Sequence, residues 1–239
     1  MKDITKTETG NNADKGMSDR ELKELAAQLG KPEGEPGIRI GVEMNTTNNS
    51  MIRKTFEHSS LRDKDYILEL GHGNANHVGE LLTGAGNLRY SGLDISEVMN
   101  REAEKYSKET GLDKLADFRI YNGTDIPFPD NSFDKIFTVN TIYFWKQPVE
   151  LLNELNRVLK PDGLLCITFV DKETMNRLPF TEYGFTKYNE SIFKSLVEKC
   201  KLYIVKITRN SEMIKSKMLG EAERIYWVAE LRKGGGLIS

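Results

Sequence analysis

The sequence has little histidine, cysteine or proline and almost no net charge. Its 239 residues include three histidines, two cysteines and seven prolines, and 34 basic side chains nearly balance 36 acidic ones. This balance gives no global field that would attract a polyanion, so we expect no nucleic acid partner. Three histidines without clustered acids give no basis for a metal site either, and we expect no metal.

Long apolar runs and paired cysteines are also missing. No stretch approaches the roughly 18 apolar residues of a membrane-spanning helix, and the first residues lack the apolar segment of a secretory signal. Cys166 and Cys200 do not form a Cys-x-x-Cys pair, which is typical of buried, reduced thiols. The sequence therefore predicts a cytoplasmic protein without a membrane span.

The chain length allows one substantial α/β domain, or at most one domain plus an extension, and we favour a single domain. Residues 1–17 are polar and predict a flexible tail, and residues 18–60 predict an N-terminal helical extension that serves as a lid. Residues 61–233 predict the main domain, and residues 234–239 a flexible C-terminus.

Within the extension, Ser18 and Glu21 form a capping box for an amphipathic helix that ends near Gly30. The glycines and prolines between Lys31 and Gly41 predict a linker. A second, short helix is expected to follow, on the spacing of Met51, Ile52 and Phe56.

In the main domain, short apolar runs alternate with helical patterns, which is typical of a parallel sheet with crossover helices. The last two expected strands follow each other without a helix between them, so one of them is expected to run antiparallel. The expected strands are Tyr66 to Leu70, Arg89 to Asp94, Ala116 to Tyr121, Phe133 to Val139, Leu164 to Val170, Leu202 to Thr208 and Arg224 to Leu231.

The first expected strand runs into a glycine turn. Gly71 and Gly73 let a ligand approach the main chain, and a helix beginning near Ala75 would offer unpaired N–H groups. A dinucleotide fingerprint needs a third glycine where Asn76 stands, and Glu69 would repel a pyrophosphate but attract a cationic ligand. The turn therefore indicates S-adenosylmethionine rather than NAD.

Asp94 ends the second expected strand, at the separation from Gly71 typical of an acid that binds a ribose. Its alternative role is that of a helix cap. Ser96 already suits the cap of the following helix, so we favour the ribose role.

Four strings of residues resemble motifs of the class I S-adenosylmethionine-dependent methyltransferases, in particular the branch of ubiquinone and menaquinone biosynthesis, and the resemblance covers about Met44 to Leu231. The strings are Leu68 to Ala75, Gly92 to Ser96, Ile126 to Asp134 and Leu159 to Leu164. The resemblance implies a Rossmann-like, doubly wound, mostly parallel seven-stranded sheet with helices on both faces and the last strand antiparallel.

Carried over to this chain, the resemblance places Gly71 and Gly73 against the methionine and ribose of the cofactor, Glu69 toward its amino end, and Asp94 on the ribose hydroxyls. The full set of expected cofactor-binding residues is Glu69, Gly71, His72, Gly73, Asn74, Asp94, Ile95, Asn122, Gly123, Asn140 and Thr141.

Asn122 departs from the family pattern, which has an acid at this position against the adenine amino group. Asn122 can still accept an N–H through its side-chain carbonyl, and Gly123 would offer a backbone N–H. Asp125 is an alternative acid, with the equally weighted role of capping a turn before Pro127.

The loop after the fourth expected strand concerns the acceptor. Thr141 and Ile142 stand where enzymes that methylate nucleic acid amines have two prolines, which argues against such amines as acceptors. Tyr143 is the candidate catalytic residue, as a side chain that positions the acceptor. Phe144 and Trp145 could equally be packing residues.

A hydroxyl or carbon acceptor would need a base, and Tyr143, His72 and His77 are the candidates. Neither histidine has an oriented partner in the sequence, and His77 has the alternative of a solvent-facing position.

Two segments are candidate lids. The first holds Asn45 and Asn48, in a Met-Asn-x-x-Asn string that resembles one found in some bacterial members. These asparagines bind a ligand or, as we favour, cap the short helix. The second is Asp171 to Tyr188, whose aromatic residues indicate an apolar pocket: Phe180, Tyr183, Phe185 and Tyr188.

The resulting hypothesis is transfer of a methyl group from S-adenosylmethionine to a small organic acceptor by in-line displacement. The alternatives are a noncatalytic module that binds this cofactor and an NAD-dependent oxidoreductase. The sequence leaves the acceptor atom and the oligomeric state open.

Overall fold

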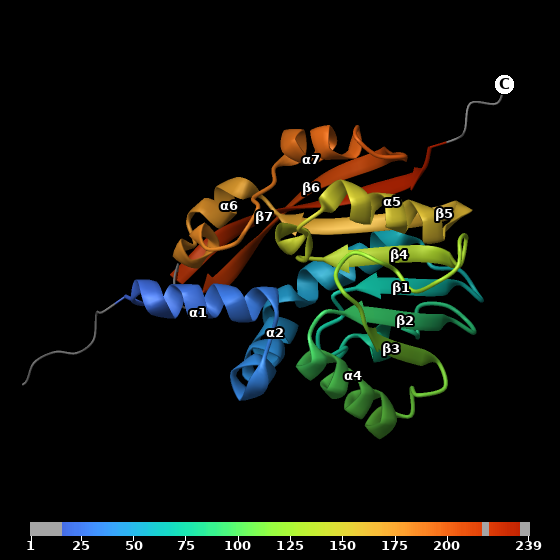
Figure 1. Ribbon diagram of the computed structural model, residues 1–239, viewed down its shortest axis with the longest axis horizontal. Helices are drawn as coiled ribbons and strands as arrows, with labels where there is room; N and C mark the ends of the chain where they lie inside the picture. Colours follow the sequence, from blue (N-terminus) through green and yellow to red (C-terminus); the bar gives the residue numbers. More distant parts are fainter. Residues whose placement is uncertain (1–15, 217–219, 235–239) are drawn as a thin grey trace, which may run out of the picture.

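The computed structural model describes residues 16–216 and 220–234. The predicted tail lies outside the described residues except for Gly16 and Met17, and the predicted C-terminal segment does so except for Gly234. Within the described part, a central sheet carries helices on both faces (Figure 1).

The sheet has seven strands in the order β3-β2-β1-β4-β5-β7-β6 (Figure 1). β7 runs antiparallel to both β5 and β6, and the other neighbouring pairs are parallel. The predicted mostly parallel, seven-stranded sheet is therefore confirmed. The strands are β1 Tyr66–Leu70, β2 Arg89–Asp94, β3 Ala116–Ile120, β4 Phe133–Val139, β5 Leu159–Val170, β6 Leu202–Ser216 and β7 Gly220–Lys233.

Side chains alternate between the two faces of the sheet, and each face has its own core. Phe137 and Cys166 lie in the core that helices α2 and α4 cover, whereas Leu165 and Ile167 lie in the core beneath α5 and α7. The helical elements are α1 Asp19–Gly30, α2 Gly34–Ser59, α3 Val78–Leu81, α4 Glu97–Thr110, η1 Ile142–Phe144, α5 Pro148–Val158, α6 Lys172–Asn176, η2 Pro179–Glu182 and α7 Glu190–Val197.

The N-terminal extension differs from the prediction. The capping box of Ser18 and Glu21 is present, but the predicted linker is wrong, because α2 is one 26-residue helix from Gly34. Pro36 lies in its first turn, where no intrahelical N–H bond is lost. A Cβ on Gly37 would come within 2.8 Å of Pro32, so this glycine permits a close approach rather than a break.

The second half of α2 belongs to the packed layers. Met51 is fully buried, and the hydroxyls of Thr55 and Thr168 of β5 are 2.7 Å apart. The first half of α2 reaches past the edge of this layer toward the carboxyl ends of the strands. The domain boundary at residue 60 and the role of a lid remain predictions.

Two local expectations are also corrected. The helix after β1 begins at Val78 rather than near Ala75, and Ala75 has a left-handed φ of 57° that breaks the helical run before it. The strand around Leu164 begins at Leu159, directly after α5, so Pro161 lies inside a strand.

Candidate functional site

A pocket of about 410 Å³ lies beyond the carboxyl ends of β1, β2 and β4, where ligands bind in open α/β sheets. All eleven residues predicted to bind the cofactor line it: Glu69, Gly71, His72, Gly73, Asn74, Asp94, Ile95, Asn122, Gly123, Asn140 and Thr141. Its volume lies within the roughly 300–1,000 Å³ of small-molecule sites. The individual roles remain predictions.

The glycine turn is held close to the loop after β4. Gly71 has a φ of 73°, and a Cβ built on it would lie 2.3 Å from Cγ2 of Thr141. Gly73 also has a positive φ, of 56°, and its N–H donates to Oδ2 of Asp94 at 3.0 Å. Both glycines are thus required by the backbone conformation, and Gly71 by the close approach as well.

Asp94 links the turn to the second strand. Its carboxylate accepts hydrogen bonds from the N–H groups of Gly73 and Ser96, and burial raises its pKa above the ordinary carboxyl value. Ser96 accepts from the N–H of Met99 and is the cap of α4, as predicted. Asp94 is therefore free of the capping role and lies in the pocket wall.

Glu69 forms a buried network rather than standing alone. Its Oε2 accepts from the hydroxyl of Tyr90 at 2.5 Å and lies 2.7 Å from Nε2 of His77. The solvent-facing alternative for His77 is wrong, because its side chain is only 12% exposed. The network fixes the direction of the Glu69 carboxylate beside the glycine turn.

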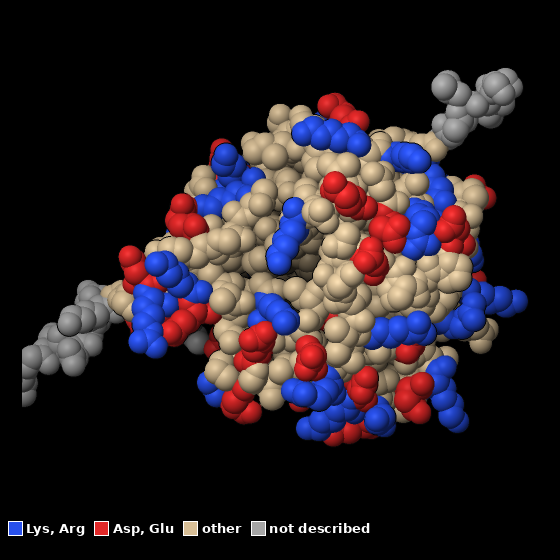
Figure 2. All heavy atoms as spheres, viewed as in Figure 1, with Lys and Arg blue, Asp and Glu red and all other residues tan. Residues whose placement is uncertain are grey.

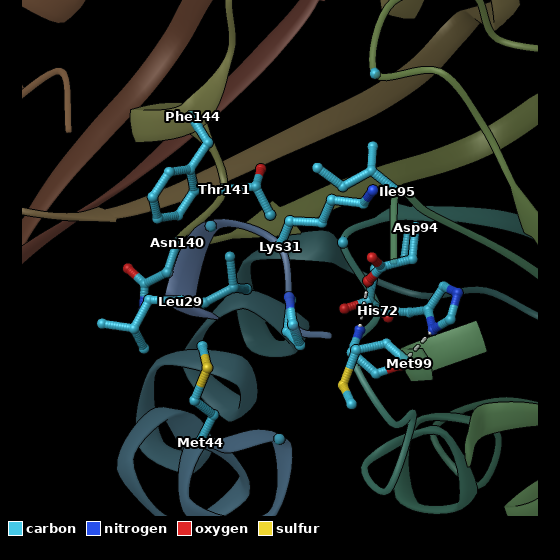
Figure 3. Close-up of a pocket in the computed structure, with 18 of the residues that line it drawn as sticks. Leu29, Lys31, Met44, His72, Asp94, Ile95, Met99, Asn140, Thr141 and Phe144 are labelled. Carbon is cyan, nitrogen blue, oxygen red and sulfur yellow. Dashed lines mark hydrogen bonds between the residues drawn. The ribbon is translucent and has the colours of Figure 1, made fainter. Parts of the chain in front are cut away.

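The ring of His72 is directed away from the centre of the pocket (Figure 3). It packs on Phe118 with ring centroids 5.0 Å apart, and Nδ1 lies 2.7 Å from the carbonyl oxygen of Gly73. Burial lowers its pKa, which favours the neutral ring with a proton on Nδ1. This arrangement argues against His72 as a base for an acceptor.

Asn122 forms a turn at the far side of the pocket. Its Oδ1 accepts from the N–H groups of Thr124 and Asp125, and its Nδ2 donates to the carboxylate of Asp125. The capping role that we considered for Asp125 therefore belongs to Asn122. Gly123 has a φ of 87° and lines the pocket next to this turn.

Asn140 is the central residue of the loop after β4, with a left-handed φ of 60°. Its Nδ2 donates to Oδ1 of Asn48 at 3.0 Å, and its Oδ1 accepts from the hydroxyl of Tyr143 at 2.8 Å. The hydroxyl of Tyr143 also accepts from the N–H of Val170. These bonds fix the orientation of the Asn140 amide.

The geometry argues against Tyr143 as a general base. Its hydroxyl already has two partners within the protein, and burial raises its pKa well above the ordinary value. Phe144 packs on Phe185, with centroids 4.6 Å apart, and Phe144 also lines the pocket. Phe144 therefore packs against another aromatic ring and also contributes to the pocket wall.

The structure adds pocket residues that the sequence interpretation missed, such as Leu29 near the end of α1 and Lys31 directly after it. The favoured capping role of Asn45 and Asn48 is wrong, because both lie inside α2. Helical spacing in the sequence could have indicated their role, because residues three or four apart share one face of a helix. The residues of α2 that line the pocket follow this spacing: Gly41, Met44, Asn45, Asn48 and Ile52.

A second, larger hollow of about 1,590 Å³ adjoins the pocket. It lies among α1, α2, the segment after β5 and the distal parts of β6 and β7. The predicted second lid contributes Phe180 and Phe185 to its wall, but Tyr183 and Tyr188 do not line it. Five residues line both spaces, and we call them the neck: Leu29, Met44, Asn48, Asn140 and Phe144.

Figure 3 shows how the labelled residues divide. Leu29, Met44, Asn140 and Phe144 of the neck gather on one side, whereas Asp94, Ile95 and Met99 lie on the other. The pocket thus extends from Asp94 to the neck.

Within residues 16–216 and 220–234, no group of three or more His, Cys, Asp or Glu side chains is arranged to hold a metal ion. Over the same residues, no helix has the length and apolar character needed to cross a membrane.

Comparison with known sequences identifies related proteins. Residues 68–167 match the model of a family described as a methyltransferase domain. An uncharacterized methyltransferase, YdaC of Bacillus subtilis, is 27% identical over 135 residues, which is 56% of this chain and 71% of that protein. The tRNA U34 carboxymethyltransferase of Cellvibrio japonicus is 31% identical over 109 residues, which is 46% of this chain but only 33% of that protein.

Comparison with solved structures supports the same fold. A chain in the complex of the Haloferax volcanii Trm112 methyltransferase activator with a candidate methyltransferase superposes with a TM-score of 0.70. The match covers 83% of this chain and 96% of that one, at 16% identity. At this identity the likeness shows the fold alone.

Proposed function

Because this chain belongs to the class I S-adenosylmethionine-dependent methyltransferases, we propose that it transfers the methyl group of that cofactor to a small organic acceptor by in-line displacement. The observation that carries the proposal is the union of two spaces at one neck. The first has the acids and glycines suited to the cofactor, and the second has room for an acceptor.

The chemistry of the first pocket fits the cofactor. Two buried carboxylates, Glu69 and Asp94, line it, and both would favour a ligand that carries positive charge and hydroxyl groups. The same carboxylates would repel the pyrophosphate of NAD. Asp94 would accept from the ribose hydroxyls, and Glu69 would lie toward the amino end.

When bound, S-adenosylmethionine supplies a methyl group on a positively charged sulfur, and its transfer leaves neutral S-adenosylhomocysteine while the acceptor, once methylated, loses a proton. The protein has to align the two reactants and keep water out. Asn140 is suited to the first task because both ends of its amide are held. Leu29, Met44 and Phe144 are the apolar side chains of the neck and are suited to keeping water out.

None of the five described residues that form the neck has a titratable side chain. Tyr143, which lines the second hollow, donates a hydrogen bond to Asn140, and burial raises its pKa, so its hydroxyl keeps its proton. We therefore propose that catalysis rests on positioning, and that the acceptor atom is nucleophilic without proton removal by a neck residue.

A small acceptor is favoured over a nucleic acid. The surface shown in Figure 2 carries basic and acidic side chains side by side, and the whole chain has a net charge of −2. Binding of an RNA would call for a basic face. The related carboxymethyltransferase acts on tRNA by its name, but the aligned part is a third of that protein and need not include what binds the RNA.

Calorimetric titration with S-adenosylhomocysteine and with NAD tests the cofactor. We expect saturable binding of the homocysteine compound and none of NAD. Tight binding of NAD without a response to S-adenosylhomocysteine would overturn the proposal. Mass spectrometry of a panel of small amines, phenols and carbon acids incubated with protein and cofactor then tests the transfer, and the proposal expects a product with one added methyl group.

A further inference from the structure

The second hollow has a composition that narrows the class of acceptor. Its volume of about 1,590 Å³ exceeds the roughly 300–1,000 Å³ that encloses a drug-sized ligand. Apolar side chains come to its wall from four separate segments of the chain. They include Leu25 of α1, Ile40 of α2, Met175 and Leu178 near α6, and Phe180 and Phe185 after it.

The charges in the wall largely cancel. Two acids and three bases line the hollow, which leaves a net charge of +1: Glu43, Glu212, Arg177, Lys215 and Arg224. The innermost of these is Arg224, which is 7% exposed. Its guanidinium lies 2.6 Å from Glu212 and donates to the carbonyl oxygen of Thr47 at 2.7 Å.

The pairing of Arg224 and the exposure of the other two bases make the hollow a poor anion site. Arg224 forms an ion pair with Glu212, and Arg177 donates a hydrogen bond to the carbonyl oxygen of Glu223. An anion at Arg224 would have to compete with the carboxylate of Glu212, whereas Arg177 and Lys215 are exposed, so solvent screens their charges. An apolar ligand would instead cover side chains that are only partly buried, such as Ile40 and Phe180.

The neck sets how such a ligand reaches the cofactor. Its only polar side chains are the amides of Asn48 and Asn140, and these are bonded to each other. The remaining neck side chains are apolar: Leu29, Met44 and Phe144. The passage therefore suits the end of an apolar skeleton better than a charged or strongly hydrated group.

On this basis we propose that the second hollow binds the methyl acceptor, and that the acceptor is a bulky, predominantly apolar molecule without strong charge whose reactive end enters the neck. This inference rests on the proposed function, since it takes the first pocket as the cofactor site. A short polar acceptor would leave most of the hollow filled with water, against apolar walls.

The test uses the neutral dye Nile red as a probe of the hollow in the full-length protein. We expect saturable binding followed by fluorescence, with an affinity that changes less than threefold when S-adenosylhomocysteine is present at saturation. Displacement of the dye by S-adenosylhomocysteine, or no saturable binding, would overturn the inference. Failure of S-adenosylhomocysteine itself to bind would instead overturn the proposed function.

Two variants locate the dye. Ile40→Asp and Phe180→Asp place a charge in the wall of the hollow from two separate elements, α2 and η2, and each should weaken dye binding tenfold or more. Val42→Asp is the matched control, because Val42 lies on the same helix as Ile40 but is 57% exposed and lines neither space.

S-adenosylhomocysteine affinity reports whether each variant is folded, since neither side chain lines the first pocket. If one of the two variants fails to bind it, the other decides the outcome. If neither folded variant weakens the dye, or if Val42→Asp weakens it equally, the inference is wrong. If both variants lose S-adenosylhomocysteine, displacement of the dye by that compound from the wild type decides it.

Discussion

Oδ1 of Asn48 accepts a hydrogen bond of 3.0 Å from Nδ2 of Asn140, although the two residues lie in helix α2 and in the loop after β4. This bond joins the N-terminal extension to the end of a central strand. It also completes the partners of the Asn140 amide, because Tyr143 donates to the other end. The orientation of the Asn140 side chain at the neck therefore depends on helix α2, which precedes the strands of the sheet in the sequence.

Replacing Asn48 should consequently affect the pocket as well as stability. Asn48→Ala removes the acceptor for Asn140, and we expect a loss of about 0.5–1.5 kcal/mol in the free energy of unfolding by urea. We also expect weaker binding of S-adenosylhomocysteine by calorimetry. Asn49→Ala is the control, since Asn49 is the next residue of the helix and is exposed. Equal results for the two variants would show that the bond has no role.

Asp94→Ala should weaken S-adenosylhomocysteine binding by about 1–3 kcal/mol, which is roughly five- to 150-fold in the dissociation constant. The change removes a charged acceptor from the pocket wall and frees the N–H of Gly73 from its partner. Calorimetric titration measures it. Asp117→Ala, on the exposed side of β3, should leave the affinity unchanged. An unaltered dissociation constant for Asp94→Ala would remove this residue from the site.

Gly92→Ala should destabilise the protein by about 1–3 kcal/mol through overpacking. A Cβ at this position would lie 2.6 Å from Cδ2 of His72 and 3.0 Å from Cδ1 of Phe118. Urea unfolding of the single variants and of Gly92→Ala with His72→Ala forms a double-mutant cycle. The second substitution should recover part of the loss. Additive effects would mean that the two side chains do not compete for the same space.

Stability should fall as the pH drops from about 7 toward 5, in part through His72. Burial lowers the pKa of His72 in the folded protein, whereas the unfolded chain has the ordinary value of about 6.5. Below that pH the unfolded chain binds a proton at His72 and the folded protein does not, so the free energy of unfolding decreases. A single such group contributes at most about 1.4 kcal/mol per pH unit.

His72→Phe keeps a ring against Phe118 and removes the titration. The wild-type-minus-variant difference in unfolding free energy, measured by urea at several pH values, should therefore fall between pH 7 and 5. The raised pKa of Asp94 acts with the opposite sign, and because His72 and Asp94 interact, the difference reports the titration of His72 together with its coupling to Asp94. A difference that does not vary with pH would contradict the assignment.

The strands and the glycine turn could be predicted from sequence because their signals are local. β1, β2 and β4 have the predicted bounds, since an apolar run between turn residues marks a buried parallel strand without reference to the rest of the fold. The acids at the strand ends could also be predicted, because parallel strands place their carboxyl ends at one edge.

Helix α2 could not be predicted in this way. Gly37 and Gly41 indicate a linker by composition, but the structure uses them as contact surfaces against Pro32 and Met99, where a Cβ would come within 2.8 Å of each. Whether a glycine breaks a helix or lets it pack closely depends on what lies opposite. For Gly41 that neighbour is Met99, which is far away in the sequence, whereas Pro32 stands just before the helix that Gly37 belongs to.

The sequence by itself determined the succession of strands along the chain, the glycine turn and the acids at the strand ends, because strand periodicity and turn chemistry act within a few residues. Only the tertiary structure decided the neck, the packing of the His72 ring on Phe118, the fixed amide of Asn140 and the second hollow. Each of these depends on contacts between distant segments, such as Asn48 with Asn140, and no local pattern encodes which distant side chain fills a given space.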